Sequence, residues 1–274
     1  MIKCCLFLLC CLGCITCSSP KKMAGIAAAY RLVWSDEFNY TGLPDLAKWS
    51  YDIGGNGWGN DEAEFYTGKR MENARVENGH LIIEARKEAL SGVEGMEGKS
   101  YTSARLVTKN KGDWQYGKLE VRAKIPRGRG SWPAIWMLGS KDNYNWPDDG
   151  EIDIMEHVGF DQGKIHASVH CKKYYHSIGT QKTAITTVAD CSENYHVYSL
   201  TWNAEMVQVA VDGKNYFSFA NEHSGYDAWP FDNKMHLLLN IAIGGGWGGQ
   251  KGIDDSIFPI QMEVDYVRMY EEKQ

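Results

Sequence analysis

The 274-residue sequence has few of the features that mark several large classes of protein. Its 29 Lys and Arg residues are scattered rather than gathered in blocks, and the net charge is −6. This charge pattern argues against nucleic acid as a partner. After the N-terminal segment no apolar run is long enough to cross a membrane. Helical periodicity is nearly absent, which argues against a helical domain.

Cysteine is scarce beyond the first 17 residues. Six of the 8 cysteines lie within that segment, and only Cys171 and Cys191 follow it. Two cysteines are too few for a disulfide scaffold. The sequence leaves open whether they form one disulfide or remain separate thiols, because it does not give their distance.

Residues 1–19 have the pattern of an export signal, with Lys3 followed by an apolar run too short for a stable membrane anchor. Leu12-Gly13-Cys14 resembles the lipobox of bacterial lipoproteins, which predicts lipidation of Cys14, with Cys17 as the alternative. We therefore expect a protein that is secreted or lipid-anchored in a bacterial cell envelope and that meets a membrane only through the lipid. Residues 20–29 would form a short linker.

Aromatic residues and glycine are abundant, with 10 Trp, 15 Tyr and 29 Gly. Strand-like runs follow one another, as in HLIIEARK (80–87), RLVTK (105–109), GKLEVRAKI (117–125), KMHLLLNIAI (234–243) and QMEVDYVRMY (261–270). Asp212-Gly213 inside 205–219 is a strong hairpin signal. This pattern predicts one all-β domain over residues 30–272, a two-sheet antiparallel sandwich of the jelly-roll kind.

The segment GEIDIMEHVG (150–159) places three carboxylates in an otherwise apolar run. Strict alternation puts Glu151 and Asp153 on one face and Glu156 on the other. One extra residue between Asp153 and Glu156, a β-bulge, would bring all three to one face. Two carboxylates about 5–5.5 Å apart are what a retaining glycosidase requires. The alternative is a set of solvent-facing charges on an edge strand.

At these residues the chain resembles glycoside hydrolase family 16, in particular its bacterial laminarinase-like group. The resemblance covers nearly the whole mature chain. It rests on segments in one order, among them WSDEFN (34–39), GNGWGNDEAEFYT (55–67), SWPAIWMLG (131–139), GEIDIMEHVG (150–159), HASVH (166–170) and NIAIGGGWGG (240–249). It implies a curved, concanavalin-like jelly roll with an open cleft on its concave face.

The resemblance also implies roles for single residues. Glu151 would be the nucleophile, Glu156 the general acid and later the base, and Asp153 the supporting carboxylate. Substrate contacts would come from Asn60, Arg105, Trp132, Trp136, Trp146, His170 and Trp247. Without the resemblance, a Trp in a sandwich is more often core than ligand platform. A zinc site at His166 and His170 is not expected, because a third ligand is missing, and His166 fits a structural role.

The family further implies a structural calcium ion held by two backbone carbonyls and one aspartate, at Glu37, Gly79 and Asp265. No cofactor is expected for catalysis. The expected activity is endo-hydrolysis of internal β-1,3 bonds of a β-glucan, and of β-1,4 bonds next to them, by a monomeric enzyme. Two alternatives remain: a non-catalytic β-glucan-binding protein on the same fold, and a hydrolase of agarose-type galactans.

Overall fold

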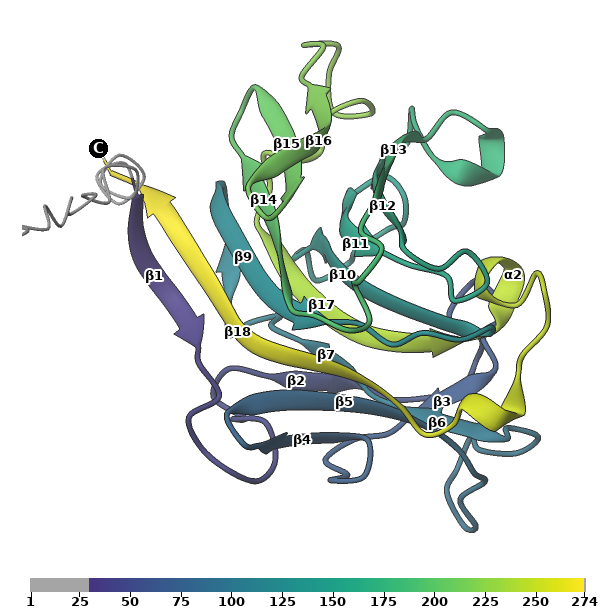
Figure 1. Cartoon of the computed structure of the whole chain (residues 1–274). Helices are drawn as coiled ribbons and strands as arrows, with labels where there is room; N and C mark the ends of the chain where they lie inside the picture. The colour runs from purple at the N-terminus through teal and green to yellow at the C-terminus, as the bar shows by residue number, and fades with distance from the viewer. Residues whose placement is uncertain (1–29, 274) are drawn as a thin grey trace, which may run out of the picture.

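The computed structural model describes residues 30–273, so the predicted export signal, linker and lipidation sites lie outside the described residues. Two stacked sheets, one of ten strands and one of eight, account for this part of the chain (Figure 1). Pairing among the described strands is antiparallel except between β3 and β6. The predicted all-β sandwich is confirmed.

The ten-stranded sheet consists of β1 (Tyr30–Asp36), β3 (Glu64–Tyr66), β4 (Ala74–Glu77), β5 (His80–Lys87), β6 (Tyr101–Ser103), β9 (Gly117–Lys124), β14 (His196–Trp202), β15 (Met206–Val211), β16 (Lys214–Ala220) and β18 (Ile260–Glu272). The eight-stranded sheet consists of β2 (Ser50–Asp52), β7 (Arg105–Val107), β8 (Asp113–Trp114), β10 (Ser131–Gly139), β11 (Glu151–Glu156), β12 (Lys164–His170), β13 (Lys182–Thr187) and β17 (Met235–Ile243).

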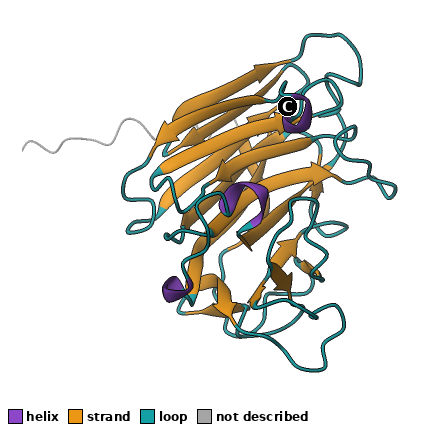
Figure 2. Cartoon of the chain, turned by 90° about the vertical axis from the view of Figure 1, so that its right-hand side faces the viewer, coloured by secondary structure: helices purple, strands orange, loops and turns teal. Residues whose placement is uncertain are grey.

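Helical structure in the described residues is limited to three short turns, namely η1 (His176–Ile178), α2 (Gly245–Gly248) and η2 (Asp255–Ile257). None of these is long and apolar enough to cross a membrane. Figure 2 shows the strands side by side, with the loops gathered at their ends.

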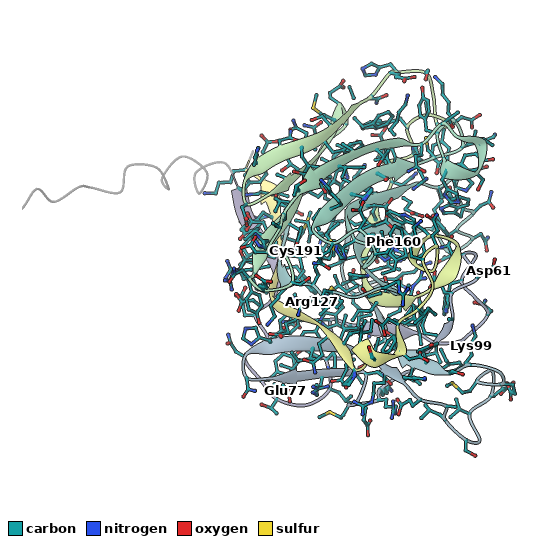
Figure 3. The ribbon with its side chains drawn as sticks, turned by 45° about the vertical axis from the view of Figure 1, so that its right-hand side comes forward. Asp61, Glu77, Lys99, Arg127, Phe160 and Cys191 are labelled. Carbon is teal, nitrogen blue, oxygen red and sulfur yellow. The ribbon has the colours of Figure 1, made fainter. Side chains whose placement is uncertain are left out.

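The core lies between the sheets, and the sequence pattern explains which side chains enter it. β9 alternates strictly between buried and partly exposed positions, in step with the alternation of its sequence, and Leu119, Val121 and Ala123 are fully buried. All nine residues of β17 are buried, and this strand lies inside the eight-stranded sheet between β10 and β7. Side chains occupy the space between the two layers (Figure 3).

Local turn chemistry fixes the hairpin between β15 and β16. Both central residues of its turn have positive φ, 50° at Asp212 and 75° at Gly213. A two-residue turn with two positive φ values suits Asp-Gly, and its twist matches that of the flanking strands. The predicted hairpin is therefore confirmed.

The two cysteines of the described chain are free thiols, and both are buried. Cys191, labelled in Figure 3, follows the turn after β13, whereas Cys171 follows β12. Burial raises the pKa of both thiols. The structure thus favours separate thiols over a disulfide.

Candidate active site

The three predicted catalytic residues lie on β11, whose register is broken by a β-bulge. Between Asp153 and Glu156 the strand advances three residues while its partner β12 advances two, from Ser168 to His166. The pairing with β10 is interrupted at the same place, and Ile154 has no register partner on either neighbour. The extra residue returns Glu156 to the face of the sheet that carries the other two carboxylates, which is the geometry predicted from the spacing.

Burial along β11 shows how the bulge divides the strand. Ile152, Ile154 and Met155 are fully buried in the core, while Glu151 and Glu156 are partly exposed on the opposite side. Without the bulge, alternation would turn Glu156 toward the core, where an unpaired carboxylate is costly.

Close packing explains the glycines at both ends of this segment. Gly150 has φ of 86°, and a Cβ there would meet the Pro230 ring at 2.9 Å. A Cβ on Gly159 would lie only 1.8 Å from the carbonyl oxygen of Gly128. Any side chain at either position would therefore displace the loops that hold the catalytic strand.

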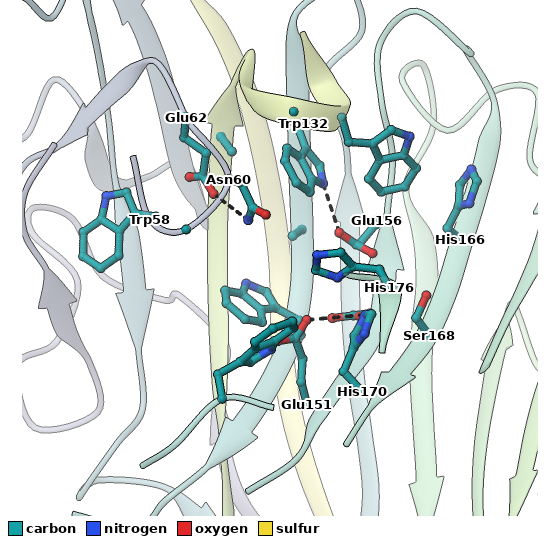
Figure 4. A pocket seen from close by; sticks show the side chains of 18 of the residues that line it. Trp58, Asn60, Glu62, Trp132, Glu151, Glu156, His166, Ser168, His170 and His176 are labelled. Carbon is teal, nitrogen blue, oxygen red and sulfur yellow. Dashed lines mark hydrogen bonds and ion pairs between the residues drawn. The ribbon is translucent and has the colours of Figure 1, made fainter. Parts of the chain in front are cut away.

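A cleft of about 970 Å³ crosses the outer face of the eight-stranded sheet above these carboxylates (Figure 4). All ten predicted catalytic and substrate-binding residues line it: Asn60, Arg105, Trp132, Trp136, Trp146, Glu151, Asp153, Glu156, His170 and Trp247. They come from β7, β10, β11, β12, α2 and two loops. The fold thus brings the whole predicted set together, and the part that each residue plays in catalysis or binding stays a prediction.

Two of the tryptophans do more than line the cleft. The Trp146 indole donates a hydrogen bond from Nε1 to Oε2 of Glu151 at 2.6 Å. The Trp132 indole donates from Nε1 to Oε1 of Glu156 at 3.0 Å. Each terminal carboxylate is therefore oriented by its own indole, a role that the sequence did not reveal because it depends on the loop before β11 and on the pairing of β10.

The imidazole ring of His170 lies beside the carboxylates of Asp153 and Glu151. Its Nε2 lies 3.3 Å from Oδ2 of Asp153 and 3.9 Å from Oε1 of Glu151. One potential ligand atom from each of these three residues lies within 4.8 Å of the others, so they are the group in the described chain able to hold a metal ion.

Burial and neighbouring negative charges raise the pKa of Asp153 and of Glu156. The pKa of Asp153 is raised well above its ordinary value, chiefly by burial and further by the charge and hydrogen bond of Glu151. The pKa of Glu156 is also raised, first by burial and then by the charges of Asp153 and Glu151, although the Trp132 N–H opposes this. A carboxyl group that keeps its proton near neutral pH can act as a general acid.

One end of the cleft, which we call the Arg105 flank, is held together by cation–π, ion-pair and hydrogen-bond contacts. The Arg105 guanidinium lies between the rings of Trp58 and Trp136, 4.6 and 4.7 Å from their centroids, and its Nε is 3.0 Å from Asp52. The Trp136 indole N–H donates to Asn240 at 2.7 Å. Trp136 is thus partly covered by a cation, which leaves less of its face for stacking than the sequence suggested.

Asn60 belongs to the same flank. Its Nδ2 donates to Glu62 (Figure 4). Glu62 also accepts a hydrogen bond from the buried Tyr66 hydroxyl. Trp58 and Glu62 line the cleft but were not singled out from the sequence. Both lie within the segment GNGWGNDEAEFYT, two residues to either side of Asn60, so the signal was present there.

The opposite end, which we call the Ser168 flank, was largely missed. It is built by Ser168 on β12, by Thr183 on β13 and by His176 and Gln181 in the loop between these strands. The ring of His166 also lines the cleft and packs edge-on against Trp247 at 4.9 Å, and the structural role expected for it stays a prediction. Small polar residues on an edge strand look like ordinary surface in a sequence.

The predicted calcium ligands lie near paired positions of the ten-stranded sheet, away from the cleft. Residue 36 pairs with 267 and residue 81 with 264, which brings Glu37, Gly79 and Asp265 toward one another. The Asp265 carboxylate, however, accepts a hydrogen bond from Arg122 at 2.6 Å. The topology fits the predicted site, and an ion there would have to displace the Arg122 guanidinium.

An antiparallel jelly roll with an acidic bulged strand under an open, tryptophan-lined cleft defines a carbohydrate-active enzyme of the retaining glycosidase class. Residues 61–268 match the model of the Glycosyl hydrolases family 16. The chain belongs to that family.

Individual relatives agree with this assignment. The chain is 52% identical to a beta-glucanase of Rhodothermus marinus over 252 residues, which span 89% of this chain and 86% of the relative. The crystal structure of the laminarinase from Rhodothermus marinus superposes with a TM-score of 0.86 at 51% identity, covering 89% of this chain and 98% of the other. SCLam, a non-specific endo-β-1,3(4)-glucanase, also gives a TM-score of 0.86, at 50% identity, with 90% and 92% covered.

Proposed function

We propose that the protein is an endo-acting β-glucanase that hydrolyses internal β-1,3 bonds of laminarin-like glucans, and β-1,4 bonds next to them, with retention of configuration. The observation that carries this proposal is the bulge in β11, which sets Glu151 and Glu156 on one face of the cleft with Asp153 between them.

In the first step, Glu156 donates its proton to the glycosidic oxygen while the carboxylate of Glu151 attacks the anomeric carbon. The aglycone leaves as an alcohol, and a covalent glycosyl-enzyme forms at Glu151. In the second step, Glu156 takes a proton from water, whose oxygen displaces Glu151 from the same carbon. The raised pKa of Glu156 keeps its proton available for the first step.

Related proteins support glucan as the substrate. A variant of SCLam crystallised with 1,3-β-D-cellotriosyl-glucose presents 1,3-β-D-cellobiosyl-glucose at its active site, and that protein is 51% identical to this chain. Relatives named endo-1,3-1,4-β-glycanases are 29% and 28% identical. Another relative, at 34% identity, is a keratan-sulfate endo-1,4-beta-galactosidase. A galactan is therefore included among the substrates to be tested.

The deciding measurement is reducing-sugar release from laminarin, barley mixed-linkage glucan and agarose, with Glu151→Gln as the control. We expect rapid release from laminarin that the substitution abolishes, and a β-configured first product by NMR. Activity on agarose alone would keep the carboxylate roles and overturn the substrate. Laminarin binding without any release would instead favour a glucan-binding protein, the name carried by a relative that is 36% identical over 171 residues.

Calcium binding at Glu37, Gly79 and Asp265 is a separate proposal, supported by the convergence of these residues in the sheet register. Hard oxygen ligands suit calcium. We expect the melting temperature to fall in EDTA and to recover with Ca²⁺ but not with Mg²⁺. Binding at 100 times the dissociation constant would add about 2.7 kcal/mol. A melting temperature that is the same in EDTA and in Ca²⁺ would rule the site out.

We also propose that the protein is exported, either anchored in the cell envelope by a lipid on Cys14 or Cys17 or secreted, and that its catalytic domain is monomeric. Incorporation of labelled palmitate by cells expressing the full chain tests the anchor. Cys14→Ser should abolish labelling if Cys14 is the modified residue, and Cys17→Ser should abolish it in the alternative. Light scattering on the mature domain gives the oligomeric state.

A further inference from the structure

Two β-bulges, one in each sheet, face each other across the sandwich. The first is the bulge of β11, where Ile154 has no register partner on β10 or β12. The second is in β16, where Phe217 pairs with Val209 and Asn215 with Ala210, so that Tyr216 is the unpaired extra residue. β16 is the end strand of the ten-stranded sheet and packs against β12 and β13 of the other sheet (Figure 1).

A single hydrogen bond joins the two bulges. The Tyr216 hydroxyl donates to the carbonyl oxygen of Ile154 at 3.1 Å. A bulge leaves backbone groups without ladder partners, and a buried carbonyl without a partner is costly. The bulge in β16 aims its tyrosine at the place where the bulge in β11 needs a donor.

The hydroxyl is a constant donor under all ordinary conditions. The Tyr216 ring is half-buried against the core. Burial raises the pKa of the phenol, and the negative charges of Glu156 and Asp153 raise it further. The group therefore remains protonated across the working range of a glycosidase, and it sits close behind the catalytic carboxylates without lining the cleft.

We propose that Tyr216 is a positioning residue that fixes the general acid/base Glu156 through the carbonyl of Ile154. Glu156 lies two residues after the bulged residue, so its direction depends on the bulge conformation. If the bulge relaxes toward regular pairing, Glu156 turns from the cleft toward the core. Partial relaxation moves the carboxylate by a fraction of that distance, and displacements near 1 Å can cost about 100-fold in rate. The inference rests on the proposed function, in which Glu156 donates and accepts the proton.

The substitution that tests this is Tyr216→Phe, which removes one hydroxyl and leaves the ring. Tyr198→Phe is the matched control, because Tyr198 is a fully buried tyrosine of the same sheet whose hydroxyl has no hydrogen-bond partner. On laminarin we expect kcat of Y216F to fall about 10- to 100-fold with KM within twofold, and the basic limb of its pH profile to move. Y198F should match the wild type, and circular dichroism should show both variants folded.

A second readout separates the acid/base from the nucleophile. With 2,4-dinitrophenyl β-laminaribioside, the aglycone leaves as dinitrophenolate and needs no proton, so Glu151 should form the glycosyl-enzyme normally in Y216F. The second step needs Glu156 to take a proton from water and should be slow. Azide attacks the anomeric carbon without losing a proton and displaces Glu151, giving a β-glycosyl azide. We therefore expect a burst of dinitrophenolate and acceleration by azide in Y216F, and neither in Y198F.

The outcomes are distinguishable. Wild-type kcat and pH profile in Y216F would overturn the positioning role and leave the proposed function intact. A lower kcat without a burst and without an azide effect would mean that the substitution impairs Glu151 or the fold. That result would also overturn the positioning role of Tyr216. A wild-type protein that hydrolyses neither laminarin nor the aryl glycoside would overturn the proposed function and this inference together.

Discussion

The two outer faces of the sandwich use carboxylates in opposite ways. On the ten-stranded sheet the carboxylates lie beside cations, with Lys124 Nζ 2.7 Å from Glu263 and Arg268 2.8 Å from Glu37. On the cleft face, the carboxylates of β11 have indole N–H groups and one imidazole as partners instead. The residue type is the same on both faces, and the neighbours differ.

The pKa values follow those neighbours. Hydrogen bonding to Arg268 lowers the pKa of Glu37, whereas burial and like charges raise that of Asp153. A lowered pKa stabilises the fold above the unfolded pKa, and this stability is lost as the pH falls through the folded value. A raised carboxyl pKa favours folding only at acid pH, and this contribution is lost as the pH rises through the folded value. The outer sheet therefore stabilises the protein at neutral pH, and the active site destabilises it.

The largest expected effect on activity and stability together is that of a substitution at Asp153. Asp153→Asn replaces a buried carboxyl group, whose charged form is disfavoured by burial and whose Oδ2 has no hydrogen-bond partner in the described structure, by a neutral amide. We expect activity to fall roughly 10-fold or more through loss of positioning, and stability at pH 7 to rise on the order of 1 kcal/mol. Because the wild-type Asp153 is itself protonated at acid pH, the stability gain should shrink as the pH falls. A variant that is less stable than the wild type at pH 7 would contradict the conclusion that the active-site carboxylates destabilise the fold.

Trp146 comes next. It is 38% exposed, so its truncation should cost little stability. Trp146→Ala removes a predicted sugar platform and the hydrogen bond to Glu151, and hydrogen bonds to charged groups contribute about 1.5–3 kcal/mol. We expect a strong rise in KM and a loss of about 10- to 100-fold in kcat/KM. Trp146→Phe keeps a ring without the N–H and should restore KM more than kcat. An unchanged KM in the alanine variant would remove Trp146 from the site.

The Trp132 hydrogen bond offers a pH test with a defined sign. Its N–H stabilises the charged form of Glu156 and so lowers the pKa of that carboxyl. Trp132→Phe should therefore raise this pKa and shift the basic limb of the kcat/KM profile to higher pH. A shift to lower pH, measured on laminarin, would contradict the assignment of Glu156 as the acid.

The smallest effect, on stability alone, is expected for a substitution on the outer face of the ten-stranded sheet. Arg268→Met breaks the pair with Glu37, in which both side chains are about one-third exposed. After allowance for solvent screening we expect a loss of about 0.5–1 kcal/mol at pH 7. The loss should diminish as the pH falls and Glu37 takes up a proton. Arg31→Met is the control, since the Arg31–Glu271 pair is far more exposed and should contribute nothing measurable.

Local pattern predicted much of this architecture. Alternation over residues 117–125 identified the buried face of β9, and Asp212-Gly213 identified the hairpin, because both depend on neighbours in sequence. The bulge in β11 was also predictable, since an odd spacing of carboxylates on a strand of period two requires an extra residue. The family resemblance extended this prediction to Asn60, Arg105, Trp132, Trp136, Trp146, His170 and Trp247, all of which line the cleft.

Other features depend on which strands pack together. The place of His166 beside Trp247 required the register of β12 against α2 and β11. The Arg122 guanidinium on Asp265 required β9 to lie next to β18. Neither contact has a local signature, because the partners are more than 80 residues apart in sequence.

The sequence by itself determined that the chain is an all-β member of its family with three carboxylates on one bulged strand. That information is carried by side-chain periodicity and by short motifs. Only the tertiary structure decided which group lies against each carboxylate: an indole N–H for Glu151 and for Glu156, an imidazole beside Asp153 and a tyrosine of the opposite sheet for the bulge itself. Strand pairing and the loop before β11 place the first three groups, whereas Tyr216 reaches the bulge because the two sheets stack. Contacts of this kind require placement within a few tenths of an ångström.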